Sequence, residues 1–428
     1  MTLSAPGSHV RIPSPRISVF RRAAIVLAVA LAACLALPAA AAEGDGKPTV
    51  TVDFPEGGLT IRSGDNSLSL GVWGQLRWTG TDRQDYDADS SGTSGFGDAD
   101  PVDNEFSIPR FRVYLQGSVW KKWLKYKLEY ELSNTSNSQG SNKIKDGFVE
   151  AALRPEFAVR FGQFKTPFGL QELTPDIRLE FQERAITDAK FTSARDMGVA
   201  ISGTTPSKAV GWSAGVFNGG GESRSQDDVG LLYVGRAWFD PLGEYKLSET
   251  AVENPDKMIL HLGAAARTGE LARGTATSGV YQNPNNETAY GAEFAWRLKR
   301  MWATAEYFRM NDEQGNPVSG PTIHSAGWHA QFGYLVTKSL ELAVRYARIN
   351  PDRSVVDDDL AEARAGVNYY WKGHNLKLQW DVGFLEYDAG YSGLGSLATR
   401  NLPALGTRLG PPQTYTDWQS RFQMQFAF

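Results

Sequence analysis

Polar and apolar residues alternate with a period of two along most of the chain. Between residues 124 and 131, lysines and glutamates at odd positions alternate with leucines and tyrosines at even positions. Residues 376–384 alternate in the same way, with Trp380 and Phe384 among the apolar positions. This period is typical of β-strands, whose successive side chains point to opposite faces. The aromatic rings lie on the apolar face and near strand ends, as in the girdles of a lipid-facing band.

The pattern predicts sixteen strands, which is an even number. They cover residues 68–79, 106–119, 123–133, 143–153, 156–164, 196–203, 208–217, 228–239, 258–268, 287–298, 301–310, 323–336, 338–349, 361–371, 374–387 and 417–428. Short connections alternate with longer polar ones, as expected for the periplasmic turns and outer loops of an outer-membrane barrel. The connection at 240–257 is long although it lies on the short-turn side. Either this turn is elaborated or the strand boundaries beside it are misplaced.

The last predicted strand carries the clearest local signal. Phe422, Met424, Phe426 and Phe428 share one face, and polar residues occupy the other. We expect this strand to pair with the first, because an open sheet edge in lipid leaves backbone groups without partners. Ending on Phe428, it also has the feature that barrel assembly machinery recognises. The predicted fold is all-β, a transmembrane antiparallel β-barrel of about 16 strands at residues 67–428, wide enough to enclose an aqueous channel.

The N-terminal region has the organisation of an export signal. Arginines at positions 16, 21 and 22 precede an apolar run at 23–37, and alanines follow up to Ala42. We predict a signal peptide at residues 1–42, a short periplasmic leader at 43–66 and delivery to the outer membrane of a Gram-negative cell. A lipoprotein box at residues 31–34, with Cys34 as the acylated residue, is the alternative.

Composition and charge exclude several classes of protein. Charged residues make up 21% of the chain, and a single long apolar stretch is present, so a polytopic helical membrane protein is excluded. Aromatic residues at 11% exclude a disordered chain. The formal net charge is −4, and no basic tail or patch suggests nucleic acid. Any preference for anions must therefore come from the local placement of charges.

Basic residues on the polar strand faces are candidates for an anion-binding constriction. Strand parity directs eleven basic residues into the channel, and five of them are candidates: Arg110, Arg112, Lys125, Lys127 and Arg160. The other six are Arg236, Arg297, Arg345, Arg364, Lys377 and Arg421. The third long loop, about 30 residues at 165–195, is expected to fold inward, and it contributes Lys165, Arg178, Arg184 and Arg195. Arginine suits oxyanions because its planar fork donates two parallel hydrogen bonds. Structural ion pairing is the alternative role for each residue, since acids are as numerous as bases in the loop.

Several motifs resemble the phosphate-selective porin O and P family. They are IKDGFVE at 144–150, VRFGQFKTPFGL at 159–170, Glu183-Arg184-Ala185 and RDMGV at 195–199. The resemblance implies a homotrimer of sixteen-stranded barrels, a third loop folded into each pore, and conduction of phosphate or pyrophosphate along an arginine ladder above a lysine cluster. Lys165, Arg184 and Arg195 match family motif positions, whereas the ladder itself has no residue-by-residue match.

Other functions are less consistent with the sequence. The chain beyond the signal has four histidines and no G-x-S-x-G motif, so we expect neither an enzyme nor a cofactor or metal site. Aspartates at positions 85, 87 and 89 resemble the start of a calcium loop, but Ser90 replaces the required glycine. That loop is either simply solvated or bridged through calcium to lipopolysaccharide. The favoured hypothesis is a passive channel for small anions such as phosphate and chloride; a non-selective porin and an adhesin or structural barrel are the alternatives.

Overall fold

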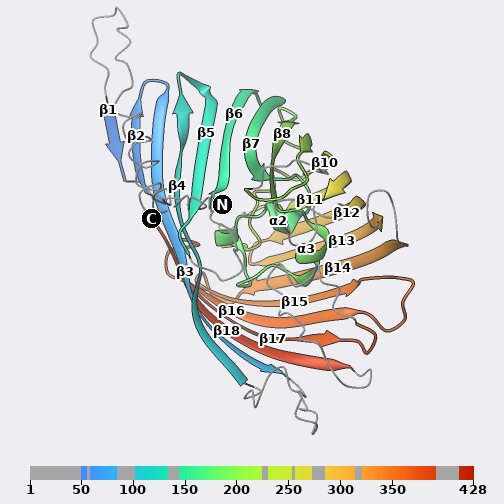
Figure 1. The fold of residues 1–428 in the computed structure, drawn as a ribbon. Helices are drawn as coiled ribbons and strands as arrows, with labels where there is room; N and C mark the ends of the chain where they lie inside the picture. The colour runs from blue at the N-terminus through green and yellow to red at the C-terminus, as the bar shows by residue number, and fades with distance from the viewer. Residues whose placement is uncertain are drawn as a thin grey trace, which may run out of the picture. The chain divides into compact units, whose positions relative to one another are not determined.

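The computed structural model describes residues 50–54, 58–83, 102–133, 144–223, 230–252, 256–271, 285–313, 321–391 and 414–428. The predicted signal peptide and the aspartates at 85–89 lie outside these residues. Sixteen antiparallel strands follow one another in chain order (Figure 1). They are β3 (Asn66–Arg83), β4 (Val102–Val119), β5 (Lys121–Glu131), β6 (Ile144–Arg154), β7 (Phe157–Lys165), β8 (Arg195–Thr204), β9 (Val210–Phe217), β10 (Leu232–Phe239), β11 (Ile259–Leu271), β12 (Asn285–Leu298), β13 (Met301–Glu313), β14 (Thr322–Leu335), β15 (Leu340–Asn350), β16 (Leu360–Tyr370), β17 (Leu376–Tyr387) and β18 (Tyr415–Ala427).

The sheet closes on itself through its first and last strands. Gln425 of β18 lies opposite Gln75 of β3, and the backbones of Phe428 and Val72 exchange hydrogen bonds of 2.7 and 2.9 Å. The predicted sixteen-stranded closed barrel is therefore confirmed. Two further strands, β1 (Val50–Asp53) and β2 (Leu59–Ser63), lie in the predicted leader. β2 pairs with the part of β3 that β18 leaves uncovered, so it extends the sheet along the same edge.

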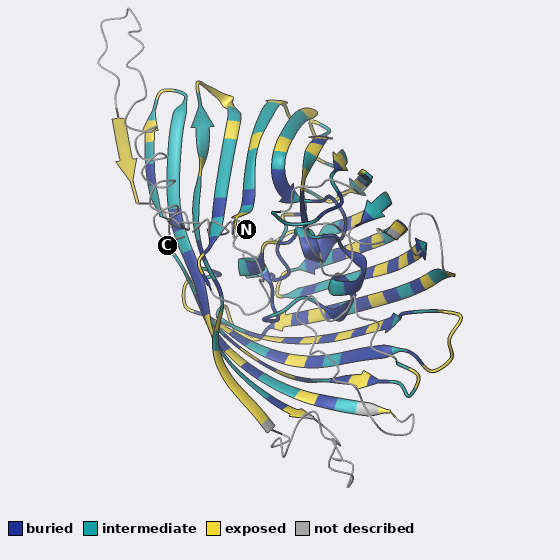
Figure 2. Cartoon of the chain, in the orientation of Figure 1, coloured by how far each residue is buried: buried dark blue, intermediate teal, exposed yellow. Residues whose placement is uncertain are grey.

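The two faces of the barrel wall differ as the alternation predicts. Along β15, Leu342 and Val344 are 48% and 53% exposed on the outer face, whereas Glu341 and Arg345, on the inner face, are 0% and 3% exposed. Figure 2 shows the same alternation of buried and exposed positions along neighbouring strands. Among the residues that the structure describes, the helices are all too short or too polar to span a bilayer.

The loop at residues 166–194, between β7 and β8, folds into the barrel. It contains α2 (Leu170–Leu173), a 3₁₀ turn η1 (Asp176–Arg178) and α3 (Ile186–Phe191), and both helices lie inside the ring of strands in Figure 1. Glu306 of β13 accepts hydrogen bonds of 2.6 and 2.8 Å from the backbone N–H groups of Leu170 and Gln171, the first turn of α2. The ring of Phe191 stacks on Phe308, with 5.3 Å between their centroids. Capping and apolar packing thus attach the loop to the wall at β13.

The middle of this loop, around residues 179–182, reaches β16 to β18, on the side of the barrel opposite β7 and β8. Lys377 of β17 donates a hydrogen bond of 2.6 Å to the carbonyl of Leu179, and Asn368 of β16 donates one of 3.1 Å to the carbonyl of Glu180. The Gln182 side chain donates to the carbonyl of Arg421 on β18. The loop therefore crosses the lumen and divides it.

The turn between β10 and β11 is elaborated, which decides between the two sequence-based alternatives. β10 and β11 lie where they were predicted, so the strand boundaries are sound. Residues 240–252 fold back into the barrel, and Glu249 is 2% exposed there. Its carboxylate accepts hydrogen bonds from the Gln171 side chain (2.7 Å), the Glu180 backbone (2.8 Å) and the Gln331 side chain (2.8 Å). Glu249 thus connects this turn to the inward loop and to β14.

Replacing Glu249 with alanine should loosen both inward elements. The substitution leaves three buried donors without an acceptor, and each costs about 1–3 kcal/mol. We expect the free energy of unfolding to fall by roughly 3 kcal/mol or more, measured by thermal circular dichroism of the detergent-solubilised protein. Single-channel currents should also become noisier.

Glu244→Ala provides the matched control in the same turn. The Glu244 side chain is 48% exposed and pairs at 2.8 Å with Lys208, whose side chain is 54% exposed. Such a surface pair contributes at most about 1 kcal/mol. Equal destabilisation by the two substitutions would contradict the role assigned to Glu249.

Two carboxyl groups share a hydroxyl where the inward loop meets the wall. The Tyr370 hydroxyl lies 2.6 Å from Glu341 Oε2 and also within hydrogen-bond distance of Glu180 Oε2. A hydroxyl carries one hydrogen, so the second contact needs a proton on a carboxyl group. Burial, together with the neighbouring Glu341, raises the pKa of Glu180 well above its usual value, against the opposing effect of Lys377. Glu180 is therefore the protonated partner.

This arrangement predicts a stability that declines as the pH rises. Because the folded-state pKa of Glu180 is raised, the stability linked to its proton is complete below the ordinary glutamate pKa of about 4.3 and is lost as the pH rises through the raised value. Thermal unfolding from about pH 5 to about pH 9 should show this decline, and Glu180→Gln should flatten it. Glu156→Gln, at an exposed position, is the control and should keep the pH dependence of the unmodified protein. If Glu180→Gln also kept that pH dependence, the assignment would be refuted.

Candidate functional site

A basic cavity opens at the short-turn end of the barrel. We call it the vestibule; its volume is about 520 Å³, and β7 to β11, the inward loop and the 240–252 turn form its walls. Two carboxylates, Asp240 and Glu244, line it. The basic side chains that line it are Arg160, Lys165, Arg178, Lys208, Arg236 and Lys246. Six cations against two carboxylates leave a formal surplus of four positive charges in a chain whose net charge is −4.

The wall arginines of the vestibule are held in place by carboxylates behind them. Arg236 donates hydrogen bonds of 2.9 and 2.7 Å to the two oxygens of Glu293, and its guanidinium lies 4.7 Å from the ring centre of Trp238. Arg160 donates to Glu150 at 2.8 Å, and its side chain remains 37% exposed. Fixed cations of this kind present charge to the cavity without having to reorganise when an ion arrives.

The lysines of the vestibule have different surroundings. Lys246 is exposed and has no ion pair among the described residues. Lys165 donates a hydrogen bond of 3.0 Å to the carbonyl of Thr174 and another to that of Glu172, so it also supports the end of α2. The sequence analysis missed Lys208 and Lys246 as site residues, because in the structure both lie in turns, where strand alternation does not fix the direction of a side chain. Lys208 fell at the start of the predicted strand 208–217, and only Lys246 lies in the 240–257 connection, whose unusual length was a signal.

Five of the other predicted site residues belong to an ion-pair network between the inward loop and β4 to β8. Asp176 binds Arg184 at 2.6 Å and Arg112 at 2.7 Å. Asp146 binds Arg195 at 2.8 Å and Lys127 at 2.6 Å. Burial alone would raise the pKa of Asp176, but Arg184, Arg112 and Arg110 hold it well below its ordinary value. This network holds the loop in position, and Lys125, exposed on β5, lies outside it.

The fifth residue of that group, Arg110, also belongs to a row of arginines that continues around the wall from β4, on the side of the lumen opposite the vestibule. We call the row the arginine belt; its members, on β3, β4, β15, β16 and β18, are Arg77, Arg110, Arg345, Arg364 and Arg421. Arg77 and Arg110 contact Glu183 of the inward loop at 2.7 and 2.6 Å. Glu362 and Asp381 bind the other three. Asp176, 3.9 Å from Arg110, is the fourth carboxylate, so five arginines against four carboxylates leave a formal surplus of one positive charge. Parity placed all of these except Arg77 in the lumen.

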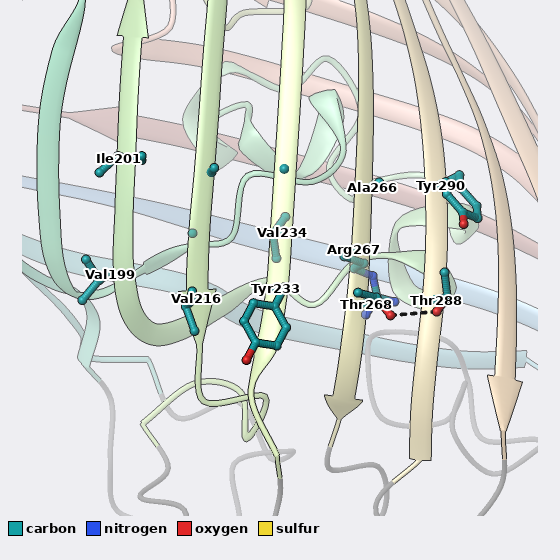
Figure 3. A pocket seen from close by; sticks show the side chains of 13 residues that line it. Val199, Ile201, Val216, Tyr233, Val234, Ala266, Arg267, Thr268, Thr288 and Tyr290 are labelled. Carbon is teal, nitrogen blue, oxygen red and sulfur yellow. Dashed lines mark hydrogen bonds between the residues drawn. The ribbon is translucent and has the colours of Figure 1, made fainter.

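A larger hollow of about 840 Å³ lies on the outer face of β8 to β12. Val199, Val216 and Tyr233 at its rim are between 38% and 53% exposed. The hydroxyls of Thr268 and Thr288 satisfy each other there at 2.9 Å (Figure 3). The exposed rim is apolar and faces away from the lumen, so this hollow is separate from the route through the barrel.

Comparisons with known proteins agree with this architecture. A family model described as phosphate-selective porin O and P matches residues 80–391. Porin O of Pseudomonas aeruginosa is 24% identical over 411 residues, which cover 83% of this chain and 89% of that protein.

Solved structures show the same fold. An anion-selective porin from Comamonas acidovorans gives a TM-score of 0.56 at 15% identity, covering 85% of this chain and 100% of that one. The trimer form of OmpT, an outer-membrane protein of Vibrio cholerae, gives 0.53 at 12% identity, covering 84% and 99%. The chain belongs to the family of phosphate-selective porins O and P, outer-membrane channels that are not enzymes.

Proposed function

We propose that this porin is a passive channel for small anions, phosphate and chloride among them. The observation that carries the proposal is the excess of basic side chains in the vestibule lining, which remains two positive charges after Glu150 and Glu293, the partners of Arg160 and Arg236, are counted. A cleft lined by charges of one sign raises the local concentration of counter-ions and the rate at which they enter. Because the whole chain is acidic, this attraction is local and concentrated where the route meets the short-turn end.

The arginine belt supports the same proposal from the far side of the inward loop. Its five guanidinium groups exceed the four carboxylates that bind them, Asp176, Glu183, Glu362 and Asp381, so the belt has a formal surplus of one positive charge. A conducting pore needs several weak sites and no single tight one, since every ion that enters must also leave. Carboxylates that already bind these arginines keep each of them a weak site for a passing anion.

The remaining parts of the proposal concern delivery and assembly. We propose that residues 1–42 are removed as a signal peptide, which leaves the barrel domain for insertion into the outer membrane. Assembly machinery would recognise the strand that ends at Phe428. A homotrimer is the proposed assembly, as in the trimer form of OmpT. Lipopolysaccharide and outer-membrane lipids are the proposed partners of the exposed outer face.

A non-selective porin is the competing function, and reversal potentials separate the two. In planar bilayers under a potassium chloride gradient, we expect a reversal potential on the anion side, with ohmic single-channel steps. Phosphate added to the bath should reduce the chloride current. A reversal potential near zero would indicate a non-selective channel, and one on the cation side would contradict the anion assignment while leaving the barrel intact.

Reversing the charge at Lys246 should weaken the anion preference. Lys246→Glu changes an exposed vestibule residue, so the fold should tolerate it. One unit charge a few ångströms from an ion is worth about 1 kcal/mol in water, so the anion-to-cation permeability ratio should fall roughly two- to fivefold at low salt. Lys338→Glu is the matched control, because Lys338 is exposed in another short turn and does not line the vestibule. Equal effects of the two substitutions would remove Lys246 from the route.

A further inference from the structure

We propose that the vestibule takes organic anions that carry an apolar part, with aromatic carboxylates as the simplest members of that class. The inference rests on the proposed anion channel and goes further, because it assigns a second kind of contact to the same cavity. The carboxylate would meet the basic side chains, and the apolar part would lie against carbon surfaces on the facing wall.

The observation behind this inference is the apolar share of the vestibule lining. Leu173 ends α2 and Pro175 directly precedes η1, whereas Leu247 comes from the 240–252 turn and Trp238 from β10. Pro175 is exposed, and Leu173 is half-buried. A cavity that served only strongly hydrated inorganic ions would gain nothing from such surfaces. Apolar area left in contact with water is unfavourable, and a ligand that covers it recovers about 25 cal/mol per Å².

Packing within the protein accounts for only part of this lining. Phe164 also faces the vestibule, but it is 3% exposed and packs edge-on against Phe217 with 5.3 Å between ring centroids. It therefore belongs to the hydrophobic core. Leu247 packs partly against Leu170 and Tyr245. Leu173 and Pro175 lie outside the buried apolar clusters of the described residues, so they are available to a solute.

Basic and apolar groups alternate closely around the cavity. Lys246 is adjacent in sequence to Leu247, and Arg178 ends the 3₁₀ turn η1 that Pro175 directly precedes. The guanidinium of Arg236 lies 4.7 Å from the Trp238 ring centre. A solute with a carboxylate at one end and a ring at the other can therefore satisfy both kinds of surface at once. The cavity volume of about 520 Å³ lies within the range of sites that bind small organic molecules, about 300–1,000 Å³.

The test compares two monocarboxylates of equal charge, benzoate and acetate, in planar bilayers. Each potassium salt is titrated against the chloride current of the full-length porin. Benzoate should reach half-maximal inhibition at a concentration roughly fivefold lower than acetate, because only its ring covers apolar surface. Equal inhibition by the two anions would overturn the inference. The proposed anion channel would survive that result, since it depends on the reversal potential and not on this comparison.

Substitutions in the vestibule lining test whether the stronger inhibition by benzoate arises there. Leu173→Asn replaces an apolar surface with a polar one of similar size. In this variant the half-inhibitory concentration of benzoate should come close to that of acetate. Leu242→Asn is the control, because Leu242 is 42% exposed in the 240–252 turn and does not line the vestibule. Pro175→Ser offers a second, exposed position if Leu173→Asn folds poorly. A preference for benzoate that persists in both Leu173→Asn and Pro175→Ser would place the ring elsewhere and overturn the assignment.

Discussion

Closure of the sheet between β18 and β3 is the constraint on which the rest of the structure depends. In hydrocarbon every unpaired backbone N–H and C=O group costs several kcal/mol, so the last strand has to find the first. Pairing from Ala427 opposite Trp73 to Asp417 opposite Arg83 meets this requirement. Once the ring is closed, its two faces have different solvents, and the period of two in the sequence follows from that difference.

A ring of sixteen strands is too wide for wall side chains to fill, and this protein fills part of the space with its own chain. The 166–194 loop and the 240–252 turn enter the lumen and meet at Glu249. Both bring polar backbone into a confined space, so wall residues must supply partners. Glu306, Asn368 and Lys377 do so for the loop. The polar inner face therefore serves loop placement as well as hydration of the pore.

The sequence predicted the features that repeat along the chain, such as the strands, and did not predict the contacts that occur only once. All sixteen strands and the inward direction of residues such as Arg345 follow from the period of two. Arg184 binds Asp176 at 2.6 Å and the backbone carbonyls at the end of α2. These contacts depend on the path of the loop, which no periodicity in the sequence encodes. The vestibule was hidden for the same reason, because Lys208 and Lys246 reach it through turns. Only the unexpected length of the 240–257 connection indicated that something there was different.

The charges in the lumen divide into two roles according to how many partners they have. Arg112 contacts Glu129 and Glu131 of β5 and Asp176 of the inward loop at once, so its guanidinium is fully occupied by contacts that hold the loop to the wall. Lys246, by contrast, is exposed and outside any ion pair in the described part of the chain. An ion in transit gains most from charges that are not already compensated nearby, since a tight carboxylate neighbour cancels most of the field of its partner. Selectivity should therefore depend less on the number of arginines in the lumen than on the few cations left uncompensated along the route.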